Sequence, residues 1–147
     1  MSTLHMAERA QVSPTTIVLR SIVVGLTLVT ATIHAQLGGL LFLANAIGYT
    51  TLALAMVAPG PIGQVRWLVR VGLIGFTAAT IGGWLLFGAR FPLAYVDKAV
   101  EVVLIAVVAF ELWRSDGGPL GVARQARGLV ARLAGRLTGT QTARAPR

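Results

Sequence analysis

Four ionisable side chains stand inside an apolar stretch at residues 91–113, where they could bind a cation, a proton or a small polar ligand. The stretch reads FPLAYVDKAVEVVLIAVVAFELW, and its ionisable residues are Asp97, Lys98, Glu101 and Glu111. At about 100° per residue, Asp97, Lys98 and Glu101 fall in one wedge of a helix. A charged group in hydrocarbon costs about 2.5–3.5 kcal/mol on insertion scales and normally faces a partner inside a bundle. The pattern therefore predicts polar partners on neighbouring helices.

Depth along the helices predicts which residues those partners are. With a rise of about 1.5 Å per residue, each position can be placed by its distance from the end of its apolar segment. Four residues, one from each segment, share a depth of about 20 Å from the inner edge and form a predicted polar layer: Thr30, Asn45, Thr80 and Glu101. Nearer the outer edge, His34 lies level with Asp97 and Lys98, which predicts an outer polar cluster. Nearer the inner edge, Arg20 and Glu111 lie level and are the predicted buried ion pair.

Three interpretations of these polar residues remain open. In the first, they satisfy one another and serve only the packing of the helices. In the second, they line an outward-opening pocket for a cation, a proton or a small polar ligand, with walls formed by His34, Asn45, Asp97 and Glu101. In the third, one imidazole and two carboxylates hold a metal ion, although no local ligand spacing singles out His34, Asp97 and Glu101. We expect no resident metal and no cofactor.

Sequence motifs of enzymes are absent from the chain. It contains no GxGxxG, GxxxxGK[ST], HExxH or GxSxG pattern, and it has no cysteine. Cysteine nucleophiles, disulfides and thiolate metal sites are therefore excluded. We expect no catalytic residue. An enzyme of lipid or quinone chemistry is the least favoured class, and it would have to use His34, Asp97 and Glu101.

The composition predicts a membrane protein. Of the 147 residues, 55% are hydrophobic and 12% are charged, and the mean hydropathy is +0.75, whereas soluble domains carry about 25% charged residues. Apolar runs predict four membrane-spanning helices at about residues 16–34, 40–57, 67–88 and 93–113. They form a transmembrane domain at 16–114, preceded by a cytoplasmic segment at 1–15 and followed by a cytoplasmic tail at 115–147. The predicted fold class is all-α, an antiparallel four-helix transmembrane bundle.

Basic residues predict the orientation of this bundle. With the N-terminus inside, eleven Lys and Arg residues fall on the cytoplasmic side and two, Arg90 and Lys98, fall on the outer side. Both termini are therefore expected in the cytoplasm, with the protein in the cytoplasmic (inner) membrane. A cleaved signal peptide ending at Ala35 is the alternative for the first span. Arg20 within that span, and the second span directly after it, argue against cleavage.

The tail is predicted to form a basic amphipathic helix, followed by a disordered end from Gly139. The apolar face of this helix carries Val122, Ala126, Leu129, Val130, Leu133 and Leu137. The arginines predicted to contact anionic lipid headgroups are Arg124, Arg127, Arg132 and Arg136. Docking of the same helix against a partner protein is the alternative.

Residues in three of the predicted spans resemble those of a known family. They are His34 at the end of the first span, the run LFLANAIGY at 41–49 and the run KAVEV at 98–102. In these features the chain is similar to a family of small prokaryotic four-span membrane proteins without an assigned activity. The resemblance covers about Thr16 to Trp113 and implies architecture only. The chain does not resemble the small multidrug-resistance exporters, because its first span lacks their membrane-embedded glutamate and Glu101 lies in the fourth span.

Together, these features favour a non-enzymatic accessory, assembly or structural subunit of a membrane complex. The alternative is a homo-oligomeric small transporter or channel that uses the carboxylate layer around Glu101. The expected partners are the lipid bilayer, its anionic headgroups, and either other proteins or further copies of this chain. Nucleic acid is not an expected partner, because positive-inside topology accounts for most of the net charge of +8.

Overall fold

The computed structural model describes residues 13–137, which form six helices and no strand. The helices are α1 (Pro14–Leu37), α2 (Leu40–Val57), α3 (Pro61–Gln64), α4 (Arg66–Phe87), α5 (Pro92–Asp116) and α6 (Gly118–Leu137). The prediction of an all-α fold is confirmed for this part of the chain. The segment at 1–12 and the end of the tail, including the disorder expected from Gly139, lie outside the described residues.

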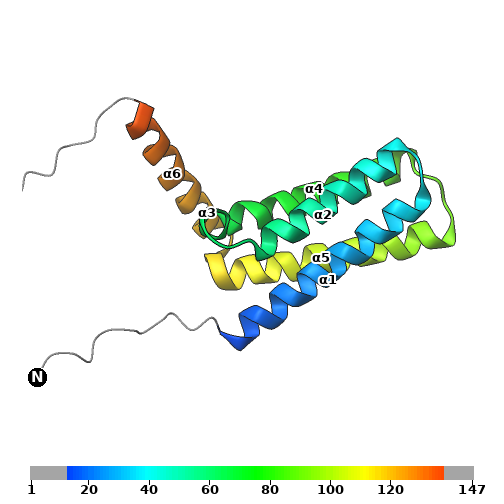
Figure 1. Cartoon of the computed structure of the whole chain (residues 1–147), viewed down its shortest axis with the longest axis horizontal. Helices are drawn as coiled ribbons and strands as arrows, with labels where there is room; N and C mark the ends of the chain where they lie inside the picture. The colour runs from blue at the N-terminus through cyan, green and yellow to red at the C-terminus, as the bar shows by residue number, and fades with distance from the viewer. Residues whose placement is uncertain (1–12, 138–147) are drawn as a thin grey trace, which may run out of the picture.

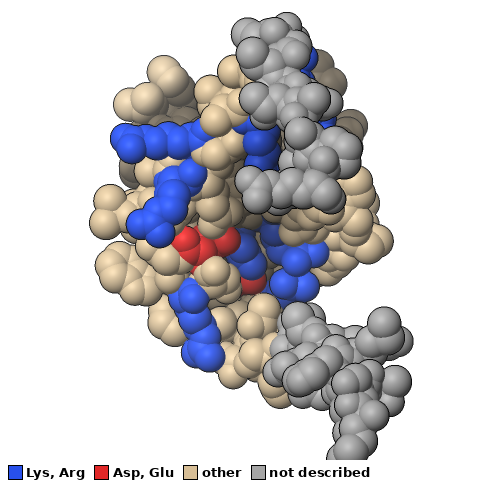
Figure 2. Space-filling view, turned by 90° about the vertical axis from the view of Figure 1, so that its left-hand side faces the viewer, with Lys and Arg blue, Asp and Glu red and all other residues tan. Residues whose placement is uncertain are grey.

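The four long helices α1, α2, α4 and α5 lie side by side as a bundle (Figure 1). α1 packs against α2 and α5, and α4 packs against the same two helices. The α1–α2 and α4–α5 links lie at one end of the bundle, which we call the hairpin end. The start of α1, the short helix α3 and the junction of α5 with α6 lie at the opposite end. We call this the arginine end, because Figure 2 shows Lys and Arg side chains gathered on it around a small acidic patch.

Local sequence sets the limits of the helices. Pro14 occupies the first turn of α1, where its missing N–H has no helical acceptor to lose. Gly38 and Gly39 have positive φ angles of 71° and 83°, which side chains rarely adopt, and they allow the tight reversal between α1 and α2. Gly117 ends α5 in the left-handed conformation, with φ of 74°. The chain therefore reverses after α1 and ends α5 at glycines with positive φ angles.

Three helices, α1, α2 and α4, are long and apolar enough to cross a membrane. α5 is the longest helix, with 25 residues, but its charged residues keep it out of this group. Large apolar side chains cover the outside of the bundle, with Leu40, Leu86 and Phe87 among the most exposed. An outer surface of this kind indicates contact with lipid, because soluble proteins rarely expose large contiguous apolar patches.

α6 leaves the bundle at an angle and contacts it through α5 (Figure 1). On its apolar side Val122, Ala126 and Leu129 are half-buried, whereas Val130 and Leu133 are exposed. The side chain of Leu137 lies outside the described part of the chain. The four arginines expected at lipid headgroups are all exposed: Arg124, Arg127, Arg132 and Arg136. Their contact with headgroups stays a prediction.

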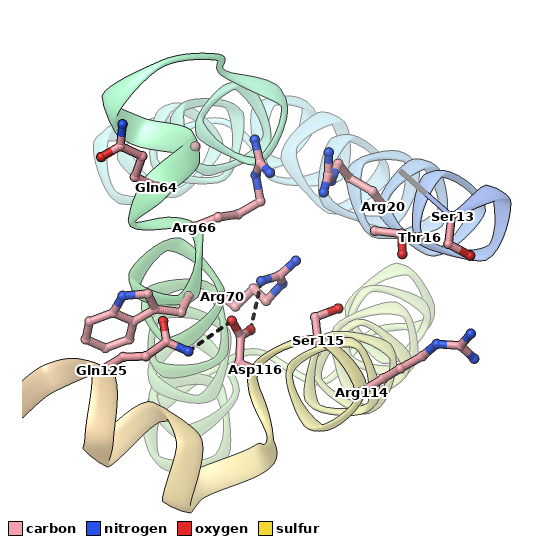
Figure 3. Close-up of a pocket in the computed structure, with 12 residues that line it drawn as sticks. Ser13, Thr16, Arg20, Gln64, Arg66, Arg70, Arg114, Ser115, Asp116 and Gln125 are labelled. Atoms are coloured by element: carbon pink, nitrogen blue, oxygen red, sulfur yellow. Dashed lines mark hydrogen bonds and ion pairs between the residues drawn. The ribbon is translucent and has the colours of Figure 1, made fainter. Parts of the chain in front are cut away.

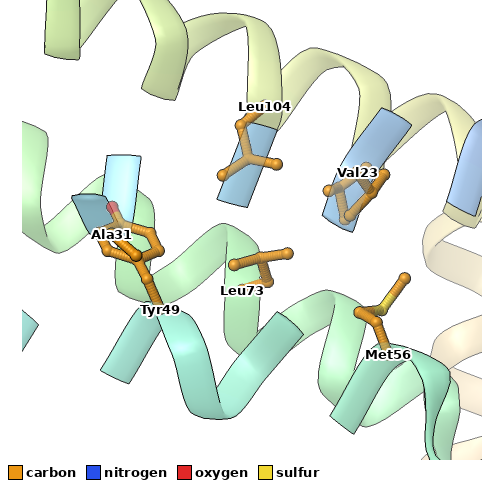
Figure 4. Packing of buried hydrophobic residues seen from close by; sticks show 7 residues of the cluster. Val23, Ala31, Tyr49, Met56, Leu73 and Leu104 are labelled. Atoms are coloured by element: carbon orange, nitrogen blue, oxygen red, sulfur yellow. The ribbon is translucent and has the colours of Figure 1, made fainter. Parts of the chain in front are cut away.

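The core lies where the four long helices meet. Its buried apolar side chains, most of them labelled in Figure 4, are Val23, Ala31, Tyr49, Met56, Leu73, Leu104 and Val108. Gly48 lets α2 approach α4, because a Cβ at this position would lie 2.5 Å from Cζ of Phe76. The Phe76 ring in turn packs edge-on against Tyr49, with ring centroids 4.9 Å apart. A residue without a side chain at position 48 therefore makes room for an aromatic ring of α4.

Gly48→Ala is expected to destabilise the protein by about 1–3 kcal/mol, because the added methyl group overpacks the Phe76 ring. Unfolding of the purified protein in a mild detergent measures this difference. Gly25→Ala on α1 is the matched control, because a Cβ at Gly25 meets no atom within 4 Å. Equal stability of the two variants would contradict the close approach of α2 to α4.

Candidate functional site

A group of polar side chains lies inside the bundle toward the hairpin end. Its ionisable members are His34 from α1 and Asp97, Lys98 and Glu101 from α5. Hydroxyl groups join it from α1, α2 and α4, on Thr30, Tyr49 and Thr80. We call these seven residues the polar cluster. Each of the four long helices contributes to it, and Asp97 and Glu101 are only 1% and 0% exposed.

Glu101 is held by three donors. Tyr49 Oη donates a hydrogen bond to Glu101 Oε1 at 2.7 Å, and Thr80 Oγ1 lies 2.9 Å from the same oxygen. Lys98 Nζ donates to Glu101 Oε2 at 2.6 Å. A buried carboxylate needs hydrogen-bond donors or a cation beside it, because its removal from water costs on the order of several kcal/mol. Both oxygens of Glu101 are therefore satisfied by α2, α4 and α5.

Lys98 also compensates the second carboxylate of the cluster. Its Nζ lies 2.9 Å from Asp97 Oδ2 and so stands between the two acids. The other oxygen, Asp97 Oδ1, accepts a hydrogen bond from Thr30 Oγ1 of α1 at 2.7 Å. One ammonium group thus bridges both carboxylates, and a threonine ties them to α1.

The surroundings of His34 fix how its ring is protonated. Nδ1 lies 2.9 Å from the carbonyl oxygen of Thr30, and because a carbonyl only accepts, Nδ1 must carry a hydrogen. Nε2 then faces Glu101 Oε1 at 3.9 Å. In the neutral ring, Nε2 bears a lone pair, so two acceptors would face each other. The geometry therefore gives Nδ1 the donor role and leaves Nε2 beside Glu101 without a hydrogen bond.

The charges of the polar cluster are unequal when His34 is neutral. Two carboxylates and one ammonium leave one formal negative charge. Donor atoms of His34, Asp97 and Glu101 all lie within 4.8 Å of one another, a spacing that could hold a metal ion. Lys98 opposes a metal here, because its ammonium already bonds one oxygen of each carboxylate that a metal ion would need as a ligand. The arrangement is therefore better suited to a hydrogen-bonding group or an organic cation in the neighbouring cavity.

The structure changes the pairing within the predicted polar layer. Thr80 contacts Glu101, whereas Thr30 bonds Asp97 rather than Glu101. Asn45 is half-buried and makes no hydrogen bond within the described part of the chain; it lines a neighbouring cavity. The outer cluster of His34, Asp97 and Lys98 merges with Glu101 into one group. Sequence reasoning missed Tyr49, which lies one helical turn after Asn45 and so on the same side of α2.

A cavity of about 400 Å³ adjoins the polar cluster. Its walls are largely apolar and come from α1, α2, α4, α5 and the α4–α5 link. The aromatic residues in these walls are Phe42, Phe76, Trp84, Phe87 and Phe91. The polar residues that line it are His34, Asn45, Thr80, Asp97 and Lys98. Four of these five belong to the polar cluster, so the cavity lies directly against the buried charged groups.

Comparisons with protein-family models, curated proteins and solved structures find no match for this chain. The geometry of its own residues must therefore carry the functional conclusion.

The predicted ion pair between Arg20 and Glu111 is wrong in the structure. Arg70 of α4 is the partner: its Nη2 donates to Glu111 Oε1 at 2.7 Å, and its Nη1 donates to Asp116 Oδ2 at 2.8 Å. Arg70 lies three residues from the Trp67 edge and Arg20 four residues from the Thr16 edge, so the two arginines share nearly the same depth. Depth alone therefore could not distinguish them. The side of α4 that packs against α5 brings Arg70 to Glu111.

Arg70→Met is expected to destabilise the protein by about 3–5 kcal/mol, because it leaves the buried Glu111 carboxylate without its cation. The double variant Arg70→Met with Glu111→Met should recover part of this loss, since an apolar pair then replaces the two charges. Unfolding in a mild detergent compares the variants.

Arg20→Met is the matched control, because Arg20 forms no ion pair among the described residues. It should change stability much less than Arg70→Met. An Arg20→Met variant as unstable as Arg70→Met would restore Arg20 as the partner of Glu111.

Proposed function

We propose that this protein is a non-enzymatic four-span membrane protein that binds a small amphipathic molecule in the cavity beside the polar cluster. The proposal rests on the position of this cavity. It is apolar and lies directly beside the polar cluster, to which all four long helices contribute. Ligand sites are typically apolar cavities with a few convergent polar groups, and this site has that composition.

Two features of α5 support its crossing of the membrane as the fourth span. Its acidic residues Asp97, Glu101 and Glu111 are buried against the other helices. Its outward side chains are large and apolar, and they are Leu93, Tyr95, Val96, Val102, Val103, Phe110 and Trp113. α5 therefore offers lipid an apolar surface, while most of its charge lies inside the bundle, where such groups are tolerated.

The distribution of basic residues supports the cytoplasmic membrane as the location, with the arginine end inside. That end carries Arg20, Arg66, Arg70 and Arg114, together with the arginines of α6. The hairpin end carries Arg90 and Lys98. Short basic segments are retained on the cytoplasmic side. In this orientation the cavity beside the polar cluster lies toward the outer side.

Two side chains in the cavity have bonding capacity left for a ligand. Asn45 lines the cavity without a hydrogen bond to any described residue, and its amide can both donate and accept. Lys98 has three N–H donors, of which Glu101 and Asp97 take two. The polar end of a ligand can therefore bond here without displacing the bonds that hold the polar cluster together.

The charge of the polar cluster defines the class of ligand. With His34 neutral, one negative charge is uncompensated, and it faces the cavity through Asp97 and His34. A polar end that donates hydrogen bonds or carries a positive charge would complement it. The apolar and aromatic walls would take a hydrocarbon or ring body.

A structural role within a membrane complex is the second candidate. Its support is the bonding of the two cluster carboxylates, whose four oxygens all have a partner within the chain. A fully satisfied polar network can serve to fix one packing of the helices. Transport by a homo-oligomer is less well supported, because Glu101 would have to lose three donors before it could bind a substrate.

Gly83 provides a test of ligand binding, because it lines the cavity and a Cβ there meets no atom within 4 Å. Gly83→Leu is expected to fill part of the cavity and remove a small molecule that wild-type protein retains. Native mass spectrometry after extraction in a mild detergent detects that molecule. Gly75→Leu is the matched control, on the same helix and in open surroundings but outside the cavity.

Single cysteines report access to the cavity, because the natural chain has none. A water-soluble cationic thiol reagent should modify Gly83→Cys and leave Gly75→Cys unmodified in lipid vesicles. Wild-type protein with no bound molecule, together with equal labelling of the two cysteines, would contradict the binding function and favour the structural candidate.

A further inference from the structure

A second cavity, of about 420 Å³, lies at the arginine end, far along the bundle from the polar cluster. Its arginines are Arg20, Arg66, Arg70 and Arg114, and its one acidic residue is Asp116. We call this cavity the arginine pocket. Figure 3 shows Arg20 of α1 and Arg66 and Arg70 of α4 extending toward the same space.

Several guanidinium groups of the arginine pocket have donors without acceptors. The Nε atoms of Arg20, Arg66 and Arg70 are all buried and have no hydrogen-bond partner within the described residues. Arg66 makes one hydrogen bond, from Nη2 to the carbonyl of Ala58 at 3.1 Å. A buried donor that stays unbonded costs free energy, and a charged donor costs more than a neutral one. One acceptor among the described residues, Glu111 Oε2, is also buried without a partner, so three unbonded guanidinium donors face a single unbonded carboxylate oxygen. The described residues therefore leave donors of the arginine pocket in excess of acceptors.

The positive charges of the arginine pocket also outnumber the negative charges near them. The charges that act on the Arg66 guanidinium are Arg20 and Arg70, which repel it, and Glu111, which attracts it. Glu111 and Asp116 are both bonded to Arg70. Arg20 and Arg66 consequently have no ion-pair partner of their own among the described residues. Two like charges held close together need an anion between them to be stable.

The remaining lining of the pocket suits a tetrahedral oxyanion. Ser13 and Thr16 of the α1 terminus and Gln64 of α3 line it and can donate hydrogen bonds. Arginine presents a planar fork of N–H donors that matches pairs of phosphate oxygens. The pocket therefore combines several guanidinium groups with two hydroxyl groups and an amide. This set of donors matches the oxygens of a phosphate group better than those of a single carboxylate.

We propose that Arg20 and Arg66 bind a phosphate group in the arginine pocket, with Arg70 held as its wall by Glu111 and Asp116. The group could belong to the headgroup of an anionic phospholipid or to a soluble phosphate compound, since both present the same oxygens. This site is separate from the arginines of α6, because Arg127 is exposed and does not line the pocket.

Two probes distinguish the sources of the phosphate group. The first is inorganic phosphate, added to full-length protein in an uncharged detergent and compared with sodium chloride at equal ionic strength by thermal unfolding. The second is dioleoylphosphatidylglycerol, compared with the phosphatidylcholine of the same chains by native mass spectrometry. Binding of phosphate alone indicates a soluble ligand, binding of the lipid alone indicates a headgroup, and binding of both supports the shared group.

Arg20→Gln and Arg66→Gln should each weaken the binding of the active probe by about tenfold or more, because each removes a charge-assisted hydrogen bond. Arg90→Gln is the matched control and should bind as wild type does, because Arg90 is exposed at the hairpin end and does not line the arginine pocket. Arg20→Lys and Arg66→Lys keep the positive charge but lose the planar guanidinium group. These variants should fold as wild type does and bind the probe with intermediate affinity. The proposal is overturned if neither probe acts on wild-type protein, or if Arg90→Gln weakens binding as much as Arg20→Gln and Arg66→Gln.

Discussion

The ammonium group of Lys98 is the contact on which the rest of the bundle depends. It lies 2.6 Å from Glu101 Oε2 and 2.9 Å from Asp97 Oδ2, where these two carboxylates are buried together. Without it, two negative charges would stand in a largely apolar interior, at a cost on the order of several kcal/mol for each charge. The remaining carboxylate oxygens then select the neighbours of α5, through Thr30 on α1, Tyr49 on α2 and Thr80 on α4.

The polar cluster and the arginine pocket, at opposite ends of the bundle, carry excess charge of opposite sign. In the polar cluster, acids exceed bases by one, every carboxylate oxygen is bonded, and an apolar cavity lies alongside. At the arginine end, bases exceed acids, and buried guanidinium donors lack acceptors. A protein that only needed to pack would have little reason to leave an imbalance at each end. The imbalances have opposite sign, so they complement ligands of opposite charge.

The sequence predicted the helices well and the contacts between them less well. Apolar runs broken by glycine and proline predicted the all-α fold, because these breaks interrupt helices in any context. Depth along a helix brought Thr80 to Glu101, but it left Arg20 and Arg70 equivalent, since it carries no information on which helix faces which. The hydrogen bond of Tyr49 was not predicted for a related reason. A tyrosine in an apolar run is usually an aromatic core residue, and only the packing of α2 against α5 brings its hydroxyl oxygen to Glu101.

The protonation of His34 tests the described bonding of the polar cluster most directly. The chain has two histidines, His5 and His34, so solid-state nitrogen NMR of histidine-labelled protein in bilayers gives few signals, and a His5→Ala variant assigns them. The Thr30 carbonyl at 2.9 Å requires a proton on Nδ1 of His34, whether or not Nε2 also carries one. A spectrum with His34 protonated on Nδ1 is the predicted result. Protonation of His34 on Nε2 alone would contradict the arrangement of the cluster.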